Sequence, residues 1–231
     1  MAGRGAGDLS LRVALYYAPD IDDPLWKLGC AWLGRDPETG AALRQPDLPD
    51  IEEVTADPRG YGFHCTLKPP MRLTTTYAEF REDVAALARS LRPFDMPPLA
   101  VADLSGFLAV RETRPSPELQ ALADACVAWV DRHRLPPDEA ELARRRKHGL
   151  PPDADALLVR WGYPGVFGRW RFHMTLTRRL TPTEHTVYRP AAERFLAEAL
   201  PHPRRADSVC IFTQKEPGAP FLLGERIPFS Q

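Results

Sequence analysis

Residues 63–67 read Phe-His-Cys-Thr-Leu, and residues 172–176 read Phe-His-Met-Thr-Leu. The two stretches differ only at the middle residue. Each is followed by a sequence typical of a helix and then by one typical of a hairpin, which ends near 106–112 or 220–226. One shared pentapeptide can arise by chance, but a shared order of motif, helix and hairpin is much harder to obtain that way. The repeat therefore predicts two related lobes.

Alternation along a strand assigns the residues of each motif to two faces, because successive side chains point to opposite sides. The apolar residues, which we expect to pack inward, are Phe63, Cys65, Leu67, Phe172, Met174 and Leu176. The polar residues, which we expect on the opposite faces, are His64, Thr66, Lys68, Arg171, His173, Thr175 and Thr177. Each strand would thus present an imidazole, a hydroxyl and a cation in a row.

These polar side chains suit a phosphoryl group. An imidazole can give or take a proton near neutral pH. A threonine hydroxyl can donate to a phosphate oxygen, and Lys68 and Arg171 are candidates to offset the charge that grows there in the transition state. Both cations could equally be solvated surface charges. Two such strands side by side would place His64 and His173 on opposite sides of the phosphorus, as an in-line displacement requires.

The paired His-x-Thr-Leu motifs resemble those of the 2H phosphoesterase superfamily. The blocks around them are similar to a branch encoded with phosphonate-degradation genes, and they read WLGRDPETG (32–40), YGFHCTLKPP (61–70), ELARRRKHGL (141–150), RWGYPGVF (160–167) and RFHMTLTRRL (171–180). The resemblance covers nearly the whole chain. It implies a duplicated fold around a central cleft, and cleavage or formation of cyclic phosphodiesters, generally without a metal. The functional positions that it implies are His64, Thr66, His173 and Thr175.

The expected fold class is α+β, a two-lobed 2H phosphoesterase-like fold with antiparallel sheets lining the cleft and helices outside. A single bilobal domain would cover residues 1–231. Its lobes would span 12–112 and 150–231, joined by helices over about 116–148.

Local signals predict the individual elements. Further strands are expected at 98–104, 107–111, 156–161, 208–215 and 220–228. Helices are expected to begin where N-caps, capping boxes or first-turn prolines occur, near Pro24, Thr76, Ser116, Asp138 and Pro182. The last helix would reach about Leu200, with a kink or break at Pro190. Residues 34–60 are expected to form a long loop.

Several further residues are left with two interpretations. Tyr61 and Tyr163 each precede a motif in a Gly-containing turn, and they would either line the cleft or pack beside it. The basic run 144–147 ends an expected helix, where the helix dipole alone favours cations, but it is also a candidate contact for a distal phosphate. The 34–60 loop would provide turns or a substrate lid. The remaining histidines, which we expect at the surface, are His133, His148, His185 and His202.

Composition limits the classes of protein that remain. The 231 residues include 30 Lys+Arg and 31 Asp+Glu, and the net charge of −1 disfavours a nucleic-acid partner and gives no attraction to a membrane. The 25 prolines argue against a coiled coil. The scattered cysteines, expected as buried thiols in a reducing compartment, are Cys30, Cys65, Cys126 and Cys210. No metal or cofactor is expected, because no further ligands stand at metal spacing. The absence of a spanning segment and of a signal peptide predicts a cytoplasmic protein.

Together with the paired motifs, the resemblance implies a metal-independent cyclic phosphodiesterase that acts on a small phosphorylated sugar. In the context of phosphonate catabolism, which the resemblance implies, the substrate would be 5-phosphoribosyl 1,2-cyclic phosphate. One alternative is a phosphodiesterase for RNA ends or nucleosides carrying a 2′,3′-cyclic phosphate. A second alternative is a non-catalytic module that binds a phosphorylated metabolite. The sequence leaves open which histidine is the acid and which the base, and it leaves the oligomeric state open.

Overall fold

The computed structural model describes residues 11–147 and 149–231. The strands are β1 (Arg12–Tyr17), β2 (Cys65–Arg72), β3 (Phe94–Asp95), β4 (Leu99–Leu104), β5 (Phe107–Glu112), β6 (Met174–Arg179), β7 (Arg205–Ala206), β8 (Ser208–Gln214) and β9 (Leu222–Pro228). The α-helices are α1 (Pro24–Leu33), α2 (Ile51–Val54), α3 (Ala56–Tyr61), α4 (Tyr77–Ser90), α5 (Pro117–Val130), α6 (Glu139–Arg146), α7 (Pro152–Trp161) and α8 (Pro182–Leu196). Short 3-10 turns cover Asp131–His133 and Phe167–Arg169.

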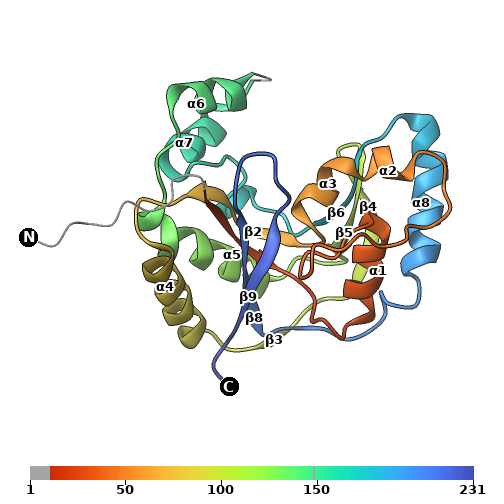
Figure 1. Cartoon of the computed structure of the whole chain (residues 1–231), viewed down its shortest axis with the longest axis horizontal. Coiled ribbons are helices and arrows are strands. Elements are labelled where there is room, and N and C mark those ends of the chain that lie inside the picture. Colours follow the sequence, from red (N-terminus) through yellow and green to blue (C-terminus); the bar gives the residue numbers. More distant parts are fainter. Residues whose placement is uncertain (1–10, 148) are drawn as a thin grey trace, which may run out of the picture.

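Seven strands form one antiparallel sheet in the order β4-β5-β6-β2-β1-β8-β9, and β3 and β7 pair separately. The sheet has two halves, which one residue pair joins, Cys65 of β2 with Met174 of β6. Helices α4 and α5 pack on the half that contains β2 and β9, whereas α1, α3 and α8 pack on the half that contains β4 and β6. Figure 1 shows these two groups of helices on either side of the strands. The expected α+β architecture with antiparallel strands is confirmed, although its two expected sheets are joined into one.

The two halves do not follow the order of the chain. Strands β1 and β2 lie beside β8 and β9, which come from the C-terminus, and β4 and β5 lie beside β6. Residues 12–112 and 150–231 therefore each contribute strands to both halves, which corrects the lobe boundaries drawn from the sequence. Alternation indicates the face of the sheet on which a side chain lies, but it does not indicate which strands pair with each other. Pairing between strands that are distant in the sequence determines the two halves of the sheet.

Most of the helices that the sequence predicts begin at the expected residues. Asp23 caps α1, and Thr76 and Glu79 form the expected capping box of α4. A proline near the start and a capped N-terminus likewise open α5 and α8. Pro190 lies inside α8, which continues through it to Leu196. The expected break at Pro190 is therefore wrong.

Two segments differ from their expected structure. Residues 156–161 belong to α7 rather than to a strand, because Ala154 and Leu158 are buried at helical spacing and Gly162 ends the helix with a φ of 77°. The expected loop at 34–60 contains a β-bridge between Arg35 and Ala42, followed by α2 and α3. The apolar run 156–161 contains no proline and reads like a buried strand, whereas residues 34–60 are polar and rich in proline, which obscured the short apolar pattern of α2 and α3.

The core contains residues from both halves and from the helices that cover them. All four cysteines are buried and unpaired, as expected. His133 is also buried, with Nε2 2.7 Å from Asp83 and Nδ1 2.6 Å from the Thr75 hydroxyl, so its expected surface position is wrong. His148 lies outside the described residues.

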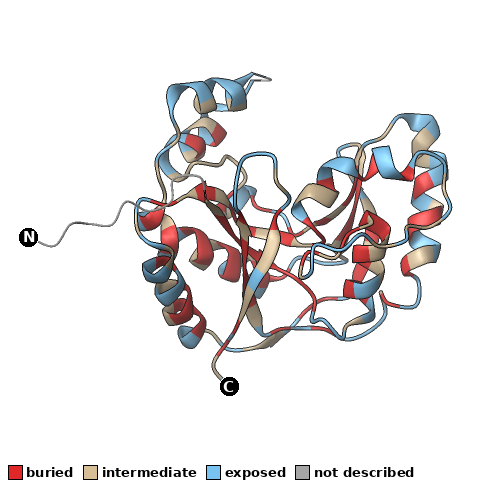
Figure 2. Ribbon diagram, in the orientation of Figure 1, coloured by how far each residue is buried: buried red, intermediate tan, exposed pale blue. Residues whose placement is uncertain are grey.

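Figure 2 shows α6 largely exposed, and none of its residues is buried. Within the described ranges, no helix combines the length and apolarity needed to cross a bilayer.

Candidate active site

The two motifs meet at their middle residues. Cys65 lies opposite Met174 in the antiparallel pairing of β2 with β6. One step outward in that register, His64 lies opposite Thr175, and Thr66 lies opposite His173. Each imidazole is therefore set beside the hydroxyl of the other motif. The six apolar motif residues are all buried, as alternation predicts.

Both histidines are held in the same way. His64 Nδ1 lies 2.8 Å from the Gly62 carbonyl, and His173 Nδ1 lies 2.7 Å from the Arg171 carbonyl. A carbonyl oxygen can only accept, so each Nδ1 carries a proton and each Nε2 is the basic nitrogen of the neutral ring. The Thr66 hydroxyl lies 3.0 Å from His64 Nε2 and donates to it in this tautomer. The duplication thus extends from the sequence to the orientation of both rings.

Burial keeps both imidazoles neutral. The His64 ring stacks on Tyr16 with centroids 3.6 Å apart, and burial lowers the pKa of His64 to about 3, although its Gly62 hydrogen bond opposes the shift. Burial also lowers the pKa of His173, and its hydrogen bond to the Arg171 carbonyl opposes this. Without a bound anion, both rings are therefore bases at neutral pH.

Gly62 determines where the His64 ring points. Its φ of 84° and ψ of 173° lie in a region that is open essentially to glycine alone. The segment before it is fixed by Arg35, whose guanidinium donates to the carbonyls of Arg59 and Phe221, both at 2.9 Å. This arrangement joins the end of α3 to the start of β9. Sequence reasoning assigned no role to Arg35 or Gly62, although a glycine two residues before the histidine was a usable signal.

Two adjoining cavities border the motifs. The first has a volume of about 260 Å³ and contains His64, Thr66, Thr175, Tyr61 and Tyr163. The second has a volume of about 280 Å³ and contains His173 and Arg171, and it shares Thr66 and Tyr163 with the first. The structure therefore brings seven of the eight candidate site residues together along one cleft.

Lys68 is the exception. Its side chain is 1% exposed, and its ammonium lies 2.8 Å from the Asp131 carboxylate. Leu15 of β1 lies opposite Lys68, but the next residue, Tyr16, lies opposite Thr66, so β2 carries an extra residue at this point. Such a bulge reverses the face that the following side chains take. The expected phosphate contact of Lys68 is therefore corrected, and the side chain forms a buried ion pair instead.

Strand β6 departs from alternation at the equivalent place. Its pairing with β5 shifts register between Phe107 and Ala109. Thr177, which alternation placed on the face of His173, is buried, and its hydroxyl accepts from the Leu108 N–H at 3.0 Å. Each motif thus ends in an irregularity that confines the reactive face to its histidine and first threonine.

Comparison with known proteins gives the family. The model of the family described as "Protein of unknown function (DUF1045)" matches residues 66–222, which is more than half of the chain. The chain belongs to this family.

The DUF1045 chain also has curated relatives. It is 38% identical over 240 residues to "Ribose 1,5-bisphosphate phosphokinase PhnN" of Janthinobacterium sp. (strain Marseille), a match that covers 98% of this chain and 52% of the relative. It is 33% identical over 218 residues to the protein of the same name from Laribacter hongkongensis (strain HLHK9), covering 92% and 50%. The chain thus spans about half the length of these relatives.

Solved structures with a similar fold include E. coli LigT complexed with 3′-AMP, at 14% identity, with a TM-score of 0.45 over 96% of this chain and 99% of that one. A structure described as a phosphoesterase matches at 12% identity, with a TM-score of 0.43 over the same shares.

Tryptophans fix the backbone of both motif strands in the DUF1045 chain. The Trp170 indole N–H donates to the Thr66 carbonyl at 2.8 Å, and the Trp32 indole donates to the Leu176 carbonyl at 3.0 Å. Trp170 also lines the cavity that contains His173. These bonds link each motif to a distant segment, so the sequence offered no local signal for them.

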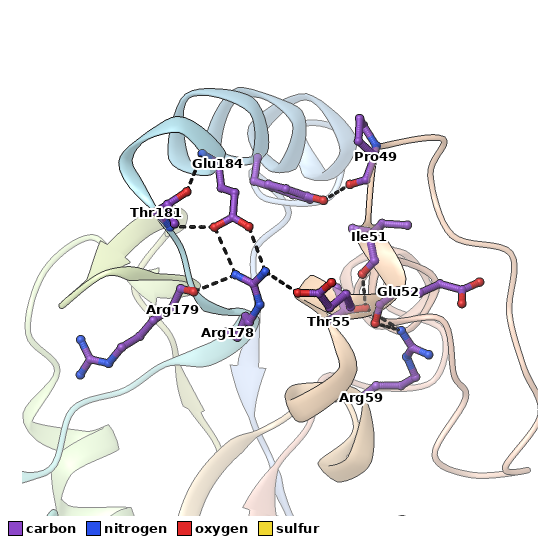
Figure 3. Close-up of polar contacts among 11 residues, drawn as sticks. Pro49, Ile51, Glu52, Thr55, Arg59, Arg178, Arg179, Thr181 and Glu184 are labelled. Carbon is purple, nitrogen blue, oxygen red and sulfur yellow. Dashed lines mark hydrogen bonds and ion pairs between the residues drawn. The ribbon is translucent and has the colours of Figure 1, made fainter.

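Charged residues connect the second motif to the helices beside the cleft. Arg178 of β6 lies 2.9 Å from Glu184 at the start of α8 and 2.9 Å from Glu53 of α2. Figure 3 shows the Arg178 guanidinium between α8 and the end of α2. Because α2 leads directly into α3, which carries Tyr61, this network fixes the segment before the first motif to β6 and α8 on one half of the sheet.

The basic run and the long loop each contribute a part to the site. Arg145 lines the cavity of His64, whereas Arg146 pairs with Asp155. From the 34–60 segment, α3 borders the cavity with Asp57 and Pro58, while residues near Gly40 form turns on Asp36. In the described ranges, no group of three or more His, Cys, Asp or Glu side chains could hold a metal ion.

Proposed function

We propose that this chain is a 2H-type cyclic phosphodiesterase that opens the ring of a small sugar cyclic phosphate without a metal. The observation that carries the proposal is the pairing of the motifs at Cys65 and Met174, which brings two identically oriented imidazoles to one cleft. A phosphorus between them would have a proton acceptor on one side and a proton donor on the other.

The reaction follows from this arrangement. The Nε2 of one imidazole takes a proton from water, and the water oxygen attacks phosphorus. The bond between phosphorus and one of the two sugar oxygens of the cyclic phosphate breaks. The second imidazole, protonated at Nε2, gives that proton to the departing sugar oxygen. Since burial keeps both rings neutral, the bound phosphate anion would supply the charge that lets one ring hold a proton. The roles of His64 and His173 exchange if the reaction runs in reverse.

The threonines would bind the phosphate itself. Thr66 and Thr175 both line the first cavity, and each lies opposite a histidine of the other motif. Their hydroxyls can donate to the two non-bridging oxygens, where negative charge grows during attack. Arg171 lines the cavity of His173 and would add positive charge on that side.

The substrate that we favour is 5-phosphoribosyl 1,2-cyclic phosphate. The curated relatives are named for a kinase that acts on ribose 1,5-bisphosphate, and this chain matches about half of their length. Hydrolysis of the bond between phosphorus and O2 of the cyclic substrate yields ribose 1,5-bisphosphate, and hydrolysis at O1 yields the 2,5-bisphosphate. A ring-opening enzyme would thus provide a product of the class that such a kinase consumes. A cytoplasmic location is part of this proposal.

Phosphorus NMR tests the proposal directly. The chain is incubated in excess EDTA with 5-phosphoribosyl 1,2-cyclic phosphate and, separately, with nucleoside 2′,3′-cyclic phosphates. We expect the cyclic phosphate signal of the ribosyl substrate to be replaced by that of a monoester, and the product to identify the bond that breaks. Equal or faster turnover of the nucleoside substrates would favour the RNA-end alternative. A requirement for an added metal would reject the metal-independent mechanism, and binding without turnover would favour the non-catalytic module.

A further inference from the structure

The cavity of His64 has a second polar region beyond the histidine. The Tyr16 side chain is completely buried, and its ring stacks on the His64 ring. Tyr16 lines the cavity, and its buried hydroxyl forms no hydrogen bond with any residue in the described ranges. Buried hydroxyls nearly always have a partner, because an unsatisfied one loses its bonds to water without replacement. A ligand oxygen in this part of the cavity would supply that partner.

Arg12 adds a positive charge at the same place. Arg12 and Tyr16 are four residues apart on β1, whose pairing with β8 is regular, so their side chains share a face. Arg12 also borders the cavity, and its guanidinium donates to the Gln214 side-chain oxygen at 3.0 Å. Within the part of the chain that the structure describes, Arg12 has no ion pair with a carboxylate. Its charge therefore remains available to an anion.

Arg145 approaches from the opposite wall. It extends from α6 into the cavity, 5.5 Å from the centre of the Tyr163 ring. Two of its nitrogens donate to one oxygen of Glu141, which leaves its other terminal nitrogen for a ligand. Among the described residues, Asp57 is the one carboxylate that lines this cavity, together with the two arginines. A neighbouring cavity of about 350 Å³ shares both arginines and adds Arg72, Arg134 and Arg144 against Asp138 and Glu141.

We propose that Arg12, Arg145 and the Tyr16 hydroxyl form a second phosphate subsite, which holds the 5-phosphate of the substrate. This inference rests on the proposed function. The strand order β6-β2-β1 places β1 on the side of β2 away from β6. The reacting phosphate belongs between His64 and His173, so a group bound by Arg12 and Tyr16 lies on the other side of His64. The subsite would orient the ring for attack through a part of the substrate that does not react.

A pair of substrates tests the subsite. kcat/KM is measured for 5-phosphoribosyl 1,2-cyclic phosphate and for ribose 1,2-cyclic phosphate, which lacks the 5-phosphate. We expect Arg12→Gln and Arg145→Gln each to lower the ratio of the two values by about 10–100-fold, the usual effect of losing a hydrogen bond to a charged group. Tyr16→Phe, which keeps the stacked ring, is expected to lower the ratio by about 3–10-fold. The matched control is Arg189→Gln, which removes the same charge from an exposed pair with Glu193 on α8 and should leave the ratio unchanged.

The outcomes separate the subsite from the proposed function. An unchanged ratio in both arginine variants would overturn the subsite while the hydrolysis stands. If the wild-type chain hydrolyses neither sugar, the proposed function fails, and calorimetric binding of ribose 5-phosphate then decides about the subsite alone. About 10–100-fold weaker binding in Arg12→Gln would support it, and equal binding would overturn it. Preference for an oligonucleotide ending in a 2′,3′-cyclic phosphate, weakened by the same variants, would also overturn it, because the arginines would then contact a nucleic-acid backbone.

Discussion

Replacing Gly62 by alanine tests whether the backbone before the first motif sets the position of its histidine. The φ of 84° is strained for any residue with a Cβ, and a Cβ here would lie 2.9 Å from the Cβ of Pro37. Residues forced into such a region cost about 1–3 kcal/mol each. We expect Gly62→Ala to lower the free energy of unfolding by about that amount, as measured by urea denaturation.

The same substitution should impair turnover. Relief of the strain requires the peptide at Gly62 to rotate, which removes the carbonyl that orients His64 at 2.8 Å. A misplaced general acid or base loses much of its contribution, so we expect kcat for 5-phosphoribosyl 1,2-cyclic phosphate to fall by about 10–100-fold. Gly60→Ala is the matched control, because a Cβ at Gly60 would meet no atom within 4 Å. A Gly62→Ala variant as stable and as active as Gly60→Ala would refute the reasoning.

Two further predictions concern the threonines and the buried imidazole. Thr66→Val and Thr175→Val should each keep the free energy of unfolding within about 1 kcal/mol but lower kcat by about tenfold, since a hydroxyl bonded to a charged phosphate is lost; unchanged kcat in both would contradict their role. Burial lowers the pKa of His64 from 6.5 to about 3, so between these values the unfolded chain binds a proton that the folded chain does not. Stability should therefore fall as the pH drops below 6.5, by about 1.4 kcal/mol per unit, or about 2 kcal/mol by pH 5. Urea unfolding at pH 7.5 and 5.0 measures this loss of unfolding free energy. In His64→Gln the loss between the two pH values should be smaller by about 2 kcal/mol, and a loss equal to that of the wild type would contradict the lowered pKa of His64.

The repeat predicted most of the site because alternation is a local property. It identified the buried residues of both motifs and the face that carries His64, Thr66, His173 and Thr175. It failed at Lys68, immediately before Pro69 and Pro70, where a bulge changes the face. Local alternation gives no sign of an inserted residue, so the sequence could not predict the ion pair of Lys68 with Asp131.

Residues on other segments were missed for a different reason. Arg12 and Tyr16 belong to a short strand whose sequence resembles any buried strand, and their importance follows from the pairing of β1 with β2. That pairing is non-local, as is the interleaving of the two halves of the sheet. The helix in 152–161 was missed because its buried positions, Ala154 and Leu158, are few and its flanks are rich in proline.

The central claim is that His64 and His173 act as one acid–base pair. The most direct measurement is kcat for 5-phosphoribosyl 1,2-cyclic phosphate, in excess EDTA, for His64→Ala, His173→Ala and the double variant. Each single variant should lower kcat by about 10²–10⁴-fold, the usual contribution of a positioned acid or base. The double variant should lose far less than the product of the two effects, because the pair acts as a unit. A single variant with near-wild-type kcat, or a double variant whose loss equals that product, would contradict the account.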